Sequence, residues 1–144
     1  MADRCQVDFY VLGDSGKSAE QLACRLALMA WEQGHRIAVL TGSAAEARKL
    51  DELMWESPAN RFLPHSLEFS DQSAPVRIGT ADTEIPGDCE VLINLTTMAV
   101  PEPSRFKRLL EIVPGSESER TASRLKFRSY REQGLQPASH TIGK

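Results

Sequence analysis

A short glycine-rich turn holds the first residues with a recognisable chemistry. Residues 13–18 read GDSGKS and follow an apolar run, residues 7–13, that predicts a buried strand. Glycine with a Lys-Ser pair between a strand and a helix is typical of a loop that binds phosphate through backbone N–H groups. Such a loop needs its first glycine at Val11, so a start at Gly13 leaves it too short. We favour a plain turn before a capped helix; the alternative is a small nucleotide-dependent enzyme that uses Lys17 and Ser18.

The other reactive side chains do not form a recognisable catalytic or metal site. A nucleotide site needs an acidic residue at a strand end for magnesium, but Asn94 occupies that place in VLINL. GDSG also surrounds the nucleophile of serine proteases, yet no histidine is well placed as a base among His35, His65 and His140. No two cysteines or histidines have ligand spacing, and the odd number of cysteines indicates reduced thiols. The sequence therefore predicts no catalytic residue, no metal and no cofactor.

Residues 50–67, LDELMWESPANRFLPHSL, are a first candidate for binding a partner. The segment begins as a helix, ends at the entry to a strand, and sets Trp55 and Phe62 around a turn broken by Pro58. Large aromatic side chains beside a polar turn either pack inward at the margin of the core or form a surface that a partner covers. Composition leaves both interpretations open.

A basic helix near the C-terminus is the second candidate. Within residues 116–134, one helix face collects Arg120, Arg124, Phe127 and Arg128 or Arg131. The commoner interpretation of such a face is a solvated charged surface. The alternative is an anion site, in which guanidinium groups pair with the carboxylates of an acidic peptide and an apolar residue packs on the ring.

The hydrophobic pattern predicts the elements that position these side chains. Capping-box pairs mark helix starts at Ser18, Ser43 and Ser116, and the helices should end near Gly34, before Pro58 and near Gly134. We expect strands at residues 7–13, 36–41, 66–69, 76–79, 91–95 and 110–113, a helical turn at 105–109, and a frayed tail at 136–144. Continuous apolar runs that alternate with helices predict an α/β fold: one domain over residues 1–144, with a mostly parallel sheet flanked by helices.

Length and charge exclude several classes of protein. The 144 residues, 41% hydrophobic and 26% charged, suit one globular domain. No apolar run could cross a bilayer and the start, MADRCQVDFY, lacks the apolar core of a signal peptide, so we expect a cytoplasmic protein without membrane contact. The net charge of -3 argues against a domain that coats nucleic acid.

Over nearly its whole length, the chain resembles the chi subunit family of bacterial DNA polymerase III. The resemblance rests on DFYVL, EQLACRLA, LDELMWESPANRFLPHSL, VLINL, IVP and FRSYREQG, and the pattern LDELMW...P...F.PH is the most specific part. It implies a Rossmann-like, nucleotide-binding-like fold without a working nucleotide site. It also implies a non-catalytic subunit, within a DNA-directed DNA polymerase (nucleotidyltransferase) complex, that works in DNA replication.

The resemblance implies two protein partners and only indirect contact with nucleic acid. In the family, chi pairs with the psi subunit, which ties it to the clamp loader. By position, psi would contact Trp55, Phe62, Pro64 and His65, and a helicase is a further partner that the resemblance leaves open for this surface.

The second partner in the family is the acidic, apolar-ended C-terminal tail of single-stranded-DNA-binding protein. By position, it would contact Val113 as an apolar wall, together with Arg120, Arg124, Phe127 and Arg128. Family members often have lysine where Arg120 stands and tyrosine where Phe127 stands, so this chain keeps the charge and the ring but loses a hydroxyl. Trp55 could belong to either surface.

Overall fold

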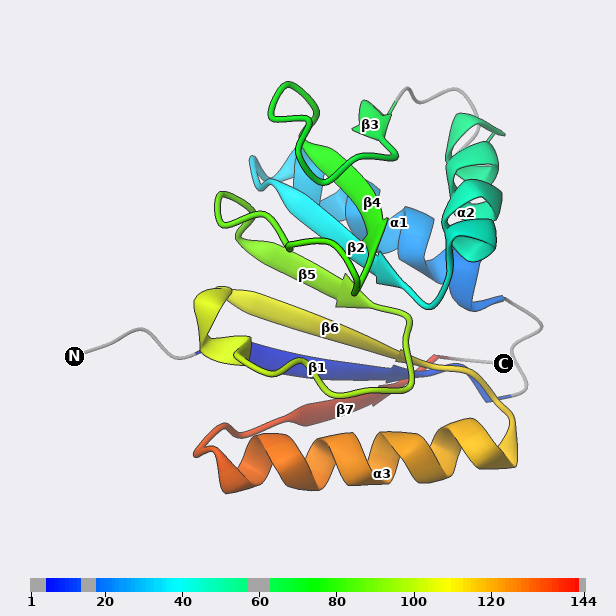
Figure 1. Cartoon of the computed structure of the whole chain (residues 1–144). Coiled ribbons are helices and arrows are strands. Elements are labelled where there is room, and N and C mark those ends of the chain that lie inside the picture. The colour runs from blue at the N-terminus through cyan, green and yellow to red at the C-terminus, as the bar shows by residue number, and fades with distance from the viewer. Residues whose placement is uncertain (1–4, 14–17, 57–62, 143–144) are drawn as a thin grey trace.

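One seven-stranded sheet organises the chain, in a computed structural model that describes residues 5–13, 18–56 and 63–142 (Figure 1). The strands are β1 (Gln6–Val11), β2 (Ile37–Thr41), β3 (His65–Ser66), β4 (Val76–Thr80), β5 (Val91–Asn94), β6 (Arg108–Val113) and β7 (Ala138–Thr141). The helices are α1 (Ala19–Glu32), α2 (Ala44–Glu56) and α3 (Glu117–Glu132). The sheet order is β3-β4-β2-β5-β6-β1-β7, and every neighbouring pair is parallel. The predicted single-domain α/β fold is confirmed.

Serine caps begin the helices at the predicted positions. The Ser18 hydroxyl accepts a hydrogen bond from Gln21 N–H at 3.0 Å, and the Gln21 side chain accepts one from Ser18 N–H at 3.1 Å, which completes a capping box. At α2, Ser43 caps Glu46 N–H at 3.2 Å, but the Glu46 carboxylate reaches back one residue further, to Gly42 N–H at 3.0 Å. None of the described helices is long and apolar enough to cross a bilayer.

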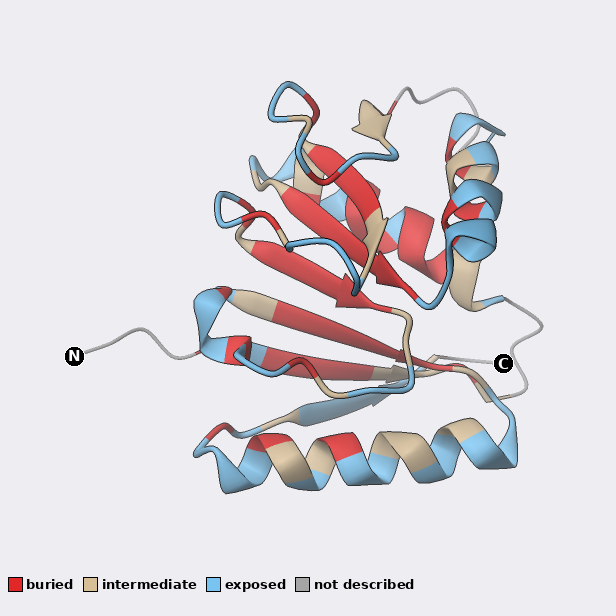
Figure 2. Cartoon of the chain, in the orientation of Figure 1, coloured by how far each residue is buried: buried red, intermediate tan, exposed pale blue. Residues whose placement is uncertain are grey.

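Helices cover the two faces of the sheet unequally. Both α1 and α2 pack on one face, and α3 packs on the other face over β6 and β1 (Figures 1 and 2). The α1/α2 core includes Leu22, Leu26, Leu50, Met54 and Ile78. On the α3 side, Phe9 and Tyr130 join side chains from loops, among them Phe69, Val100 and Phe106. Loops therefore complete the second face where α3 does not reach.

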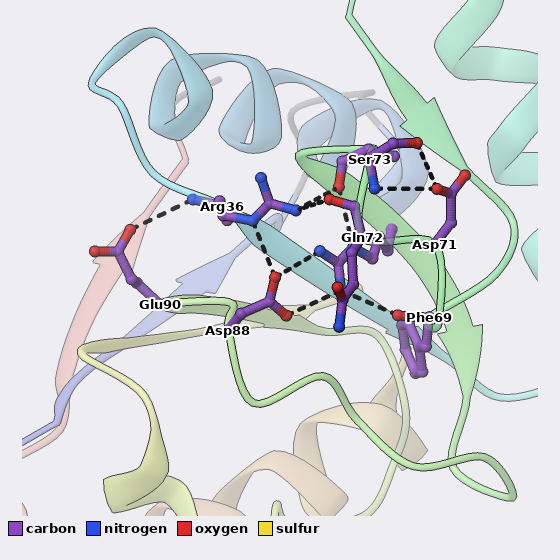
Figure 3. A network of polar contacts seen from close by, with 9 residues as sticks. Arg36, Phe69, Asp71, Gln72, Ser73, Asp88 and Glu90 are labelled. Atoms are coloured by element: carbon purple, nitrogen blue, oxygen red, sulfur yellow. Dashed lines mark hydrogen bonds and ion pairs between the residues drawn. The ribbon is translucent and has the colours of Figure 1, made fainter.

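A polar network ties loops to the amino-terminal ends of β2, β4 and β5 (Figure 3). The buried Arg77 guanidinium donates to both carboxylate oxygens of Asp88, at 3.0 and 2.7 Å, and to the carbonyl of Phe69 at 3.1 Å. Arg36 donates to Asp88 at 3.2 Å and to the carbonyl of Gln72 at 2.5 Å. The hydrogen bond from Arg77 holds the pKa of Asp88 below its usual range. These bonds fix the loop that brings Phe69 over the sheet.

Three sequence predictions need correction. Residues 105–109 were expected to start a helical turn, but only a 3-10 turn at Pro103–Arg105 forms, and β6 already begins at Arg108. The short strand predicted at residues 66–69 is β3, which lies earlier, at His65–Ser66. The tail expected to fray from residue 136 instead contains β7, which pairs in parallel with β1 through Asp8↔Ala138 to Val11↔Thr141. Pairing with a distant strand, and not local pattern, orders this segment.

Candidate partner-binding surfaces

Helix α3 separates its basic residues onto two faces. Its N-cap is Ser116, whose hydroxyl accepts a hydrogen bond from Glu119 N–H at 3.3 Å. Lys126 and Tyr130, one helical turn apart, are buried against the sheet at 5% and 0% exposure. The other face exposes Arg120, Arg124, Arg128 and Arg131. The basic run of α3 therefore contains one buried lysine, Lys126, which anchors the helix to the sheet, and a row of exposed arginines.

The anchor is a buried ion pair between α3 and β6. Lys126 Nζ lies 2.7 Å from Glu111 Oε1, and Glu111 Oε2 accepts hydrogen bonds from Tyr130 Oη at 2.5 Å and Asn94 Nδ2 at 2.9 Å. Lys126 also donates to the carbonyl of Thr96 at 2.8 Å. Burial, and then the Glu111 charge, raise the pKa of Tyr130, so its hydroxyl stays protonated and donates. This network fixes the position of α3 on the sheet and the rotation of the helix about its own axis.

A depression of about 450 Å³ opens between α3 and the neighbouring strands. Four residues predicted to bind the acidic tail line it: Val113, Arg120, Arg124 and Phe127. The fifth, Arg128, lines an adjoining depression that shares Arg124 and Phe127 and also includes Arg131 and Glu132. The structure therefore brings together all five residues.

The depression combines apolar and cationic walls. Phe127 is half-buried and packs on Phe9 with ring centroids 5.2 Å apart, which fixes the ring while leaving part of it accessible. Within the described part of the chain, no carboxylate forms an ion pair with Arg120, Arg124 or Arg128. Uncompensated guanidinium groups beside an accessible ring suit a ligand with both carboxylates and an apolar group.

Sequence reasoning missed the contribution of the C-terminal strand. Ser139 and Thr141 of β7 line the same depression as Arg120 and Arg124. The β7 segment, ASHT, is polar and exposed throughout, so it carries neither the apolar run nor the alternation that marks a strand. No local pattern in this segment could therefore have marked it as a strand.

The second predicted surface lies at the β3 end of the sheet. Trp55, near the end of α2, is 62% exposed, and its ring centroid lies 4.7 Å from that of His65. Pro64 is half-buried beside it, and His65 is partly exposed through its backbone although its side chain is fully buried. Phe62 lies outside the described residues. The structure therefore groups three of the four residues predicted to contact psi.

His65 connects this surface to α2. Its Nδ1 donates to the carbonyl of Leu63 at 2.7 Å, and its Nε2 lies 3.0 Å from the Asp51 carboxylate, without the alignment of a hydrogen bond. A carbonyl oxygen only accepts, so Nδ1 carries a proton. The His65 side chain is fully buried, and its contacts hold the ring against which Trp55 packs. Trp55 groups with His65 and lines neither α3 depression, which separates it from the basic surface.

The described part of the chain has few groups that could bind the phosphates of a nucleotide. Lys17 lies outside it, and the Ser18 hydroxyl caps α1. Asn94 Nδ2 is bonded to Glu111 and to the carbonyl of Met98. A depression of about 950 Å³ at the carboxyl ends of β2, β4 and β5 has one arginine and five acidic residues in its lining: Glu46, Asp82, Glu84, Glu102 and Glu119. Such a lining repels a polyphosphate, and no cluster of metal-ligating residues occurs in the described ranges.

Comparison with known proteins gives consistent matches to one family. A family model described as DNA polymerase III chi subunit, HolC, matches residues 5–138. DNA polymerase III subunit chi of Pseudomonas aeruginosa is 40% identical over 139 residues, which covers 95% of this chain and 96% of that protein. The subunit chi of Escherichia coli is 30% identical over 134 residues, covering 88% and 91%.

A solved structure shares the fold alone. A DEAD box protein from the hyperthermophile Methanococcus jannaschii aligns with a TM-score of 0.62 at 12% sequence identity. The alignment covers 96% of this chain, which spans 42% of that chain's length. The likeness supports the α/β architecture that the sequence pattern predicted.

Proposed function

This chain belongs to the DNA polymerase III chi subunit family, and we propose that it is a non-catalytic adaptor in DNA replication. It is a component of the polymerase complex with an accessory role. One surface binds psi and so reaches the clamp loader, and the other binds the acidic C-terminal tail of single-stranded-DNA-binding protein. Contact with DNA is then indirect, through the protein that coats the template.

The depression beside α3 is the observation that carries the tail-binding proposal. Arg120 and Arg124 face it without carboxylate partners among the described residues, and Arg128 continues the row. Val113 and Phe127 supply its apolar walls. A peptide with several carboxylates and an apolar end matches both features, because charge-assisted bonds and packing on a ring can form together.

The exposed Trp55 supports the psi proposal. Large aromatics are enriched where proteins bind one another, and a tryptophan that is 62% exposed leaves much apolar area open to a partner. Trp55 packs on the buried ring of His65, which a hydrogen bond to the carbonyl of Leu63 fixes, so the surface is ordered before a partner binds. We include Phe62 on the sequence resemblance, and propose that a helicase would compete with psi here.

The two proposed surfaces lie at opposite ends of the sheet. Trp55 and His65 belong to the β3 end, whereas the depression involves β1 and β7. Parallel strands are spaced by about 4.8 Å, so a seven-stranded sheet separates its edges by on the order of 30 Å. Both partners could bind one molecule at once, as a bridging subunit requires.

Titration calorimetry with an acidic, apolar-ended tail peptide tests the first surface. Arg124→Ala should weaken binding by about 1.5–3 kcal/mol, because a hydrogen-bonded charge is lost, and wild-type affinity should fall steeply with salt. Arg25→Ala is the matched control, since Arg25 is exposed on α1 on the opposite face. Unchanged affinity in Arg124→Ala would show that the tail site is elsewhere.

Co-purification with psi tests the second surface. Trp55→Ala should weaken psi binding at least 10-fold, as expected for an interface tryptophan, and should leave tail-peptide affinity intact. Met98→Ala removes another apolar side chain, 73% exposed in a loop away from this surface, and serves as the control. Equal recovery of psi with both variants would reject Trp55 as a contact.

A further inference from the structure

Strand β7 leaves an open edge of the sheet beside the α3 depression. It is the last strand in the sheet order and, among the described residues, pairs only with β1. The strand at the opposite edge, β3, has only two residues, whereas β7 has four. The β7 strand also lacks the lysines and prolines that commonly protect an edge from another strand. Its free backbone groups are therefore available for pairing.

The register identifies which backbone groups of β7 are free. Ile142 N–H donates to the carbonyl of Val11 at 2.8 Å, so the backbone of residue 142 points toward β1. Successive residues of a strand direct their backbone groups to opposite neighbours, so His140 also points toward β1. Ser139 and Thr141 then present their N–H and C=O groups at the open edge. The side chains of the same two residues line the depression.

The arginines of α3 have a spacing that suits an extended peptide. Residues four apart on a helix, such as Arg120, Arg124 and Arg128, are separated by about 6 Å along its axis. Alternate residues of a strand are separated by about 6.6 Å and lie on one face. Every second side chain of a strand added to β7 would therefore point to the same side as Ser139 and Thr141, toward successive arginines.

We propose that an acidic peptide binds by strand addition. It pairs with the open edge of β7 through Ser139 and Thr141, and alternate carboxylates face the arginines of α3. This inference rests on the proposed function, because the peptide is the acidic, apolar-ended tail proposed above. Backbone pairing supplies the register, and the arginines select for carboxylates.

A proline at the edge tests the backbone contact. Thr141→Pro removes one outward N–H group and no hydrogen bond to β1, and prolines are tolerated on edge strands when that group faces solvent. Thr141→Val keeps the N–H group and loses the same hydroxyl, so it is the matched reference. With both variants confirmed as folded by circular dichroism, the proline variant should bind the tail peptide roughly 3- to 10-fold more weakly than the valine variant.

Backbone methylation of the peptide is an independent measurement on the unaltered protein. A series of tail peptides is made, each with a single N-methyl group at a different position. Affinity should fall when the methyl group occupies every second position of the bound segment. This period of two follows because only alternate N–H groups of an added strand face β7.

The outcomes separate this inference from the proposed function. Equal binding by Thr141→Pro and Thr141→Val, or loss from methylation without a period of two, would overturn strand addition. If Arg124→Ala still abolished binding in that case, the tail site would stand and only its mode of recognition would be wrong. If Arg124→Ala also bound normally, the proposed tail site itself would fail.

Discussion

Replacement of Lys126 by methionine separates the anchor of α3 from its binding face. Methionine keeps a long apolar stem but removes the charge that faces Glu111, which is 0% exposed and lies 2.7 Å from Lys126 Nζ. Removal of one partner from a buried pair is strongly destabilising, at about 3–5 kcal/mol, because the remaining charge lacks compensation.

The lower end of that range applies here. Glu111 retains hydrogen bonds from Tyr130 and Asn94 in Lys126→Met, so the carboxylate is not left bare. We expect the free energy of unfolding to fall by about 3 kcal/mol. For a chain of this length, this lowers the melting temperature by on the order of 10 °C.

Urea unfolding of three variants measures the effect. Lys126→Met should lose the full amount, whereas Lys126→Met with Glu111→Gln should recover at least about 1 kcal/mol, because it removes the unpaired charge. At a temperature where all are folded, tail-peptide affinity should change far less in Lys126→Met than in Arg124→Ala. A loss below about 1 kcal/mol would refute the buried-pair reasoning, and no recovery in the double variant would refute the assigned cause.

Three further predictions follow from buried groups. Burial alone would raise the pKa of Asp8, but hydrogen bonds from His140 and Arg108 hold it below its usual value. The stabilisation by Asp8 is therefore complete above pH about 4 and is lost as pH falls through the lower folded pKa. The difference in unfolding free energy between wild type and Asp8→Asn, measured in urea from pH 5 downward, should close below pH about 4; a constant difference would contradict this. Gly79→Ala places a Cβ 2.7 Å from the Phe69 ring and should cost about 1–3 kcal/mol in the same assay, whereas Gly87→Ala meets no atom within 4 Å and should be neutral. Burial raises the pKa of each thiol, to about 11, 12 and 11, so a thiol reagent should react slowly with the folded protein and rapidly in urea at Cys5, Cys24 and Cys89; fast labelling of the folded protein would show that a thiol is accessible.

Sequence reasoning succeeded where local signals decide the structure. The continuous apolar run at β2 is buried at all five positions, and the caps at Ser18 and Ser116 begin α1 and α3. The arginines of α3 were correctly placed along one face, because helical spacing determines that face. The position of Lys126 could not be predicted in the same way, since its buried partner is on β6.

Long-range pairing explains what the sequence did not reveal. β7 is polar and exposed, and only its register with β1, about 130 residues earlier, makes it a strand. The same holds for Arg108 and Leu109, which join β6 through pairing with Gln6 and Val7 of β1 although their local pattern suggested a helical turn. The site residues contributed by β7 were missed for this reason.

The anchor network also bears on why a nucleotide-binding-like fold would serve as an adaptor. In open α/β sheets, ligands usually bind outside the carboxyl ends of the strands. In this chain Glu111, on β6, instead accepts hydrogen bonds from Lys126 and Tyr130 of α3, and Asn94, at the end of β5, donates to Glu111. Polar groups that could have faced a ligand therefore hold a helix. Because α3 is held rigidly on its sheet-facing side, its outer face presents Arg120, Arg124 and Arg128 at fixed spacing. Charges that are already in position bind an acidic peptide at a lower entropic cost.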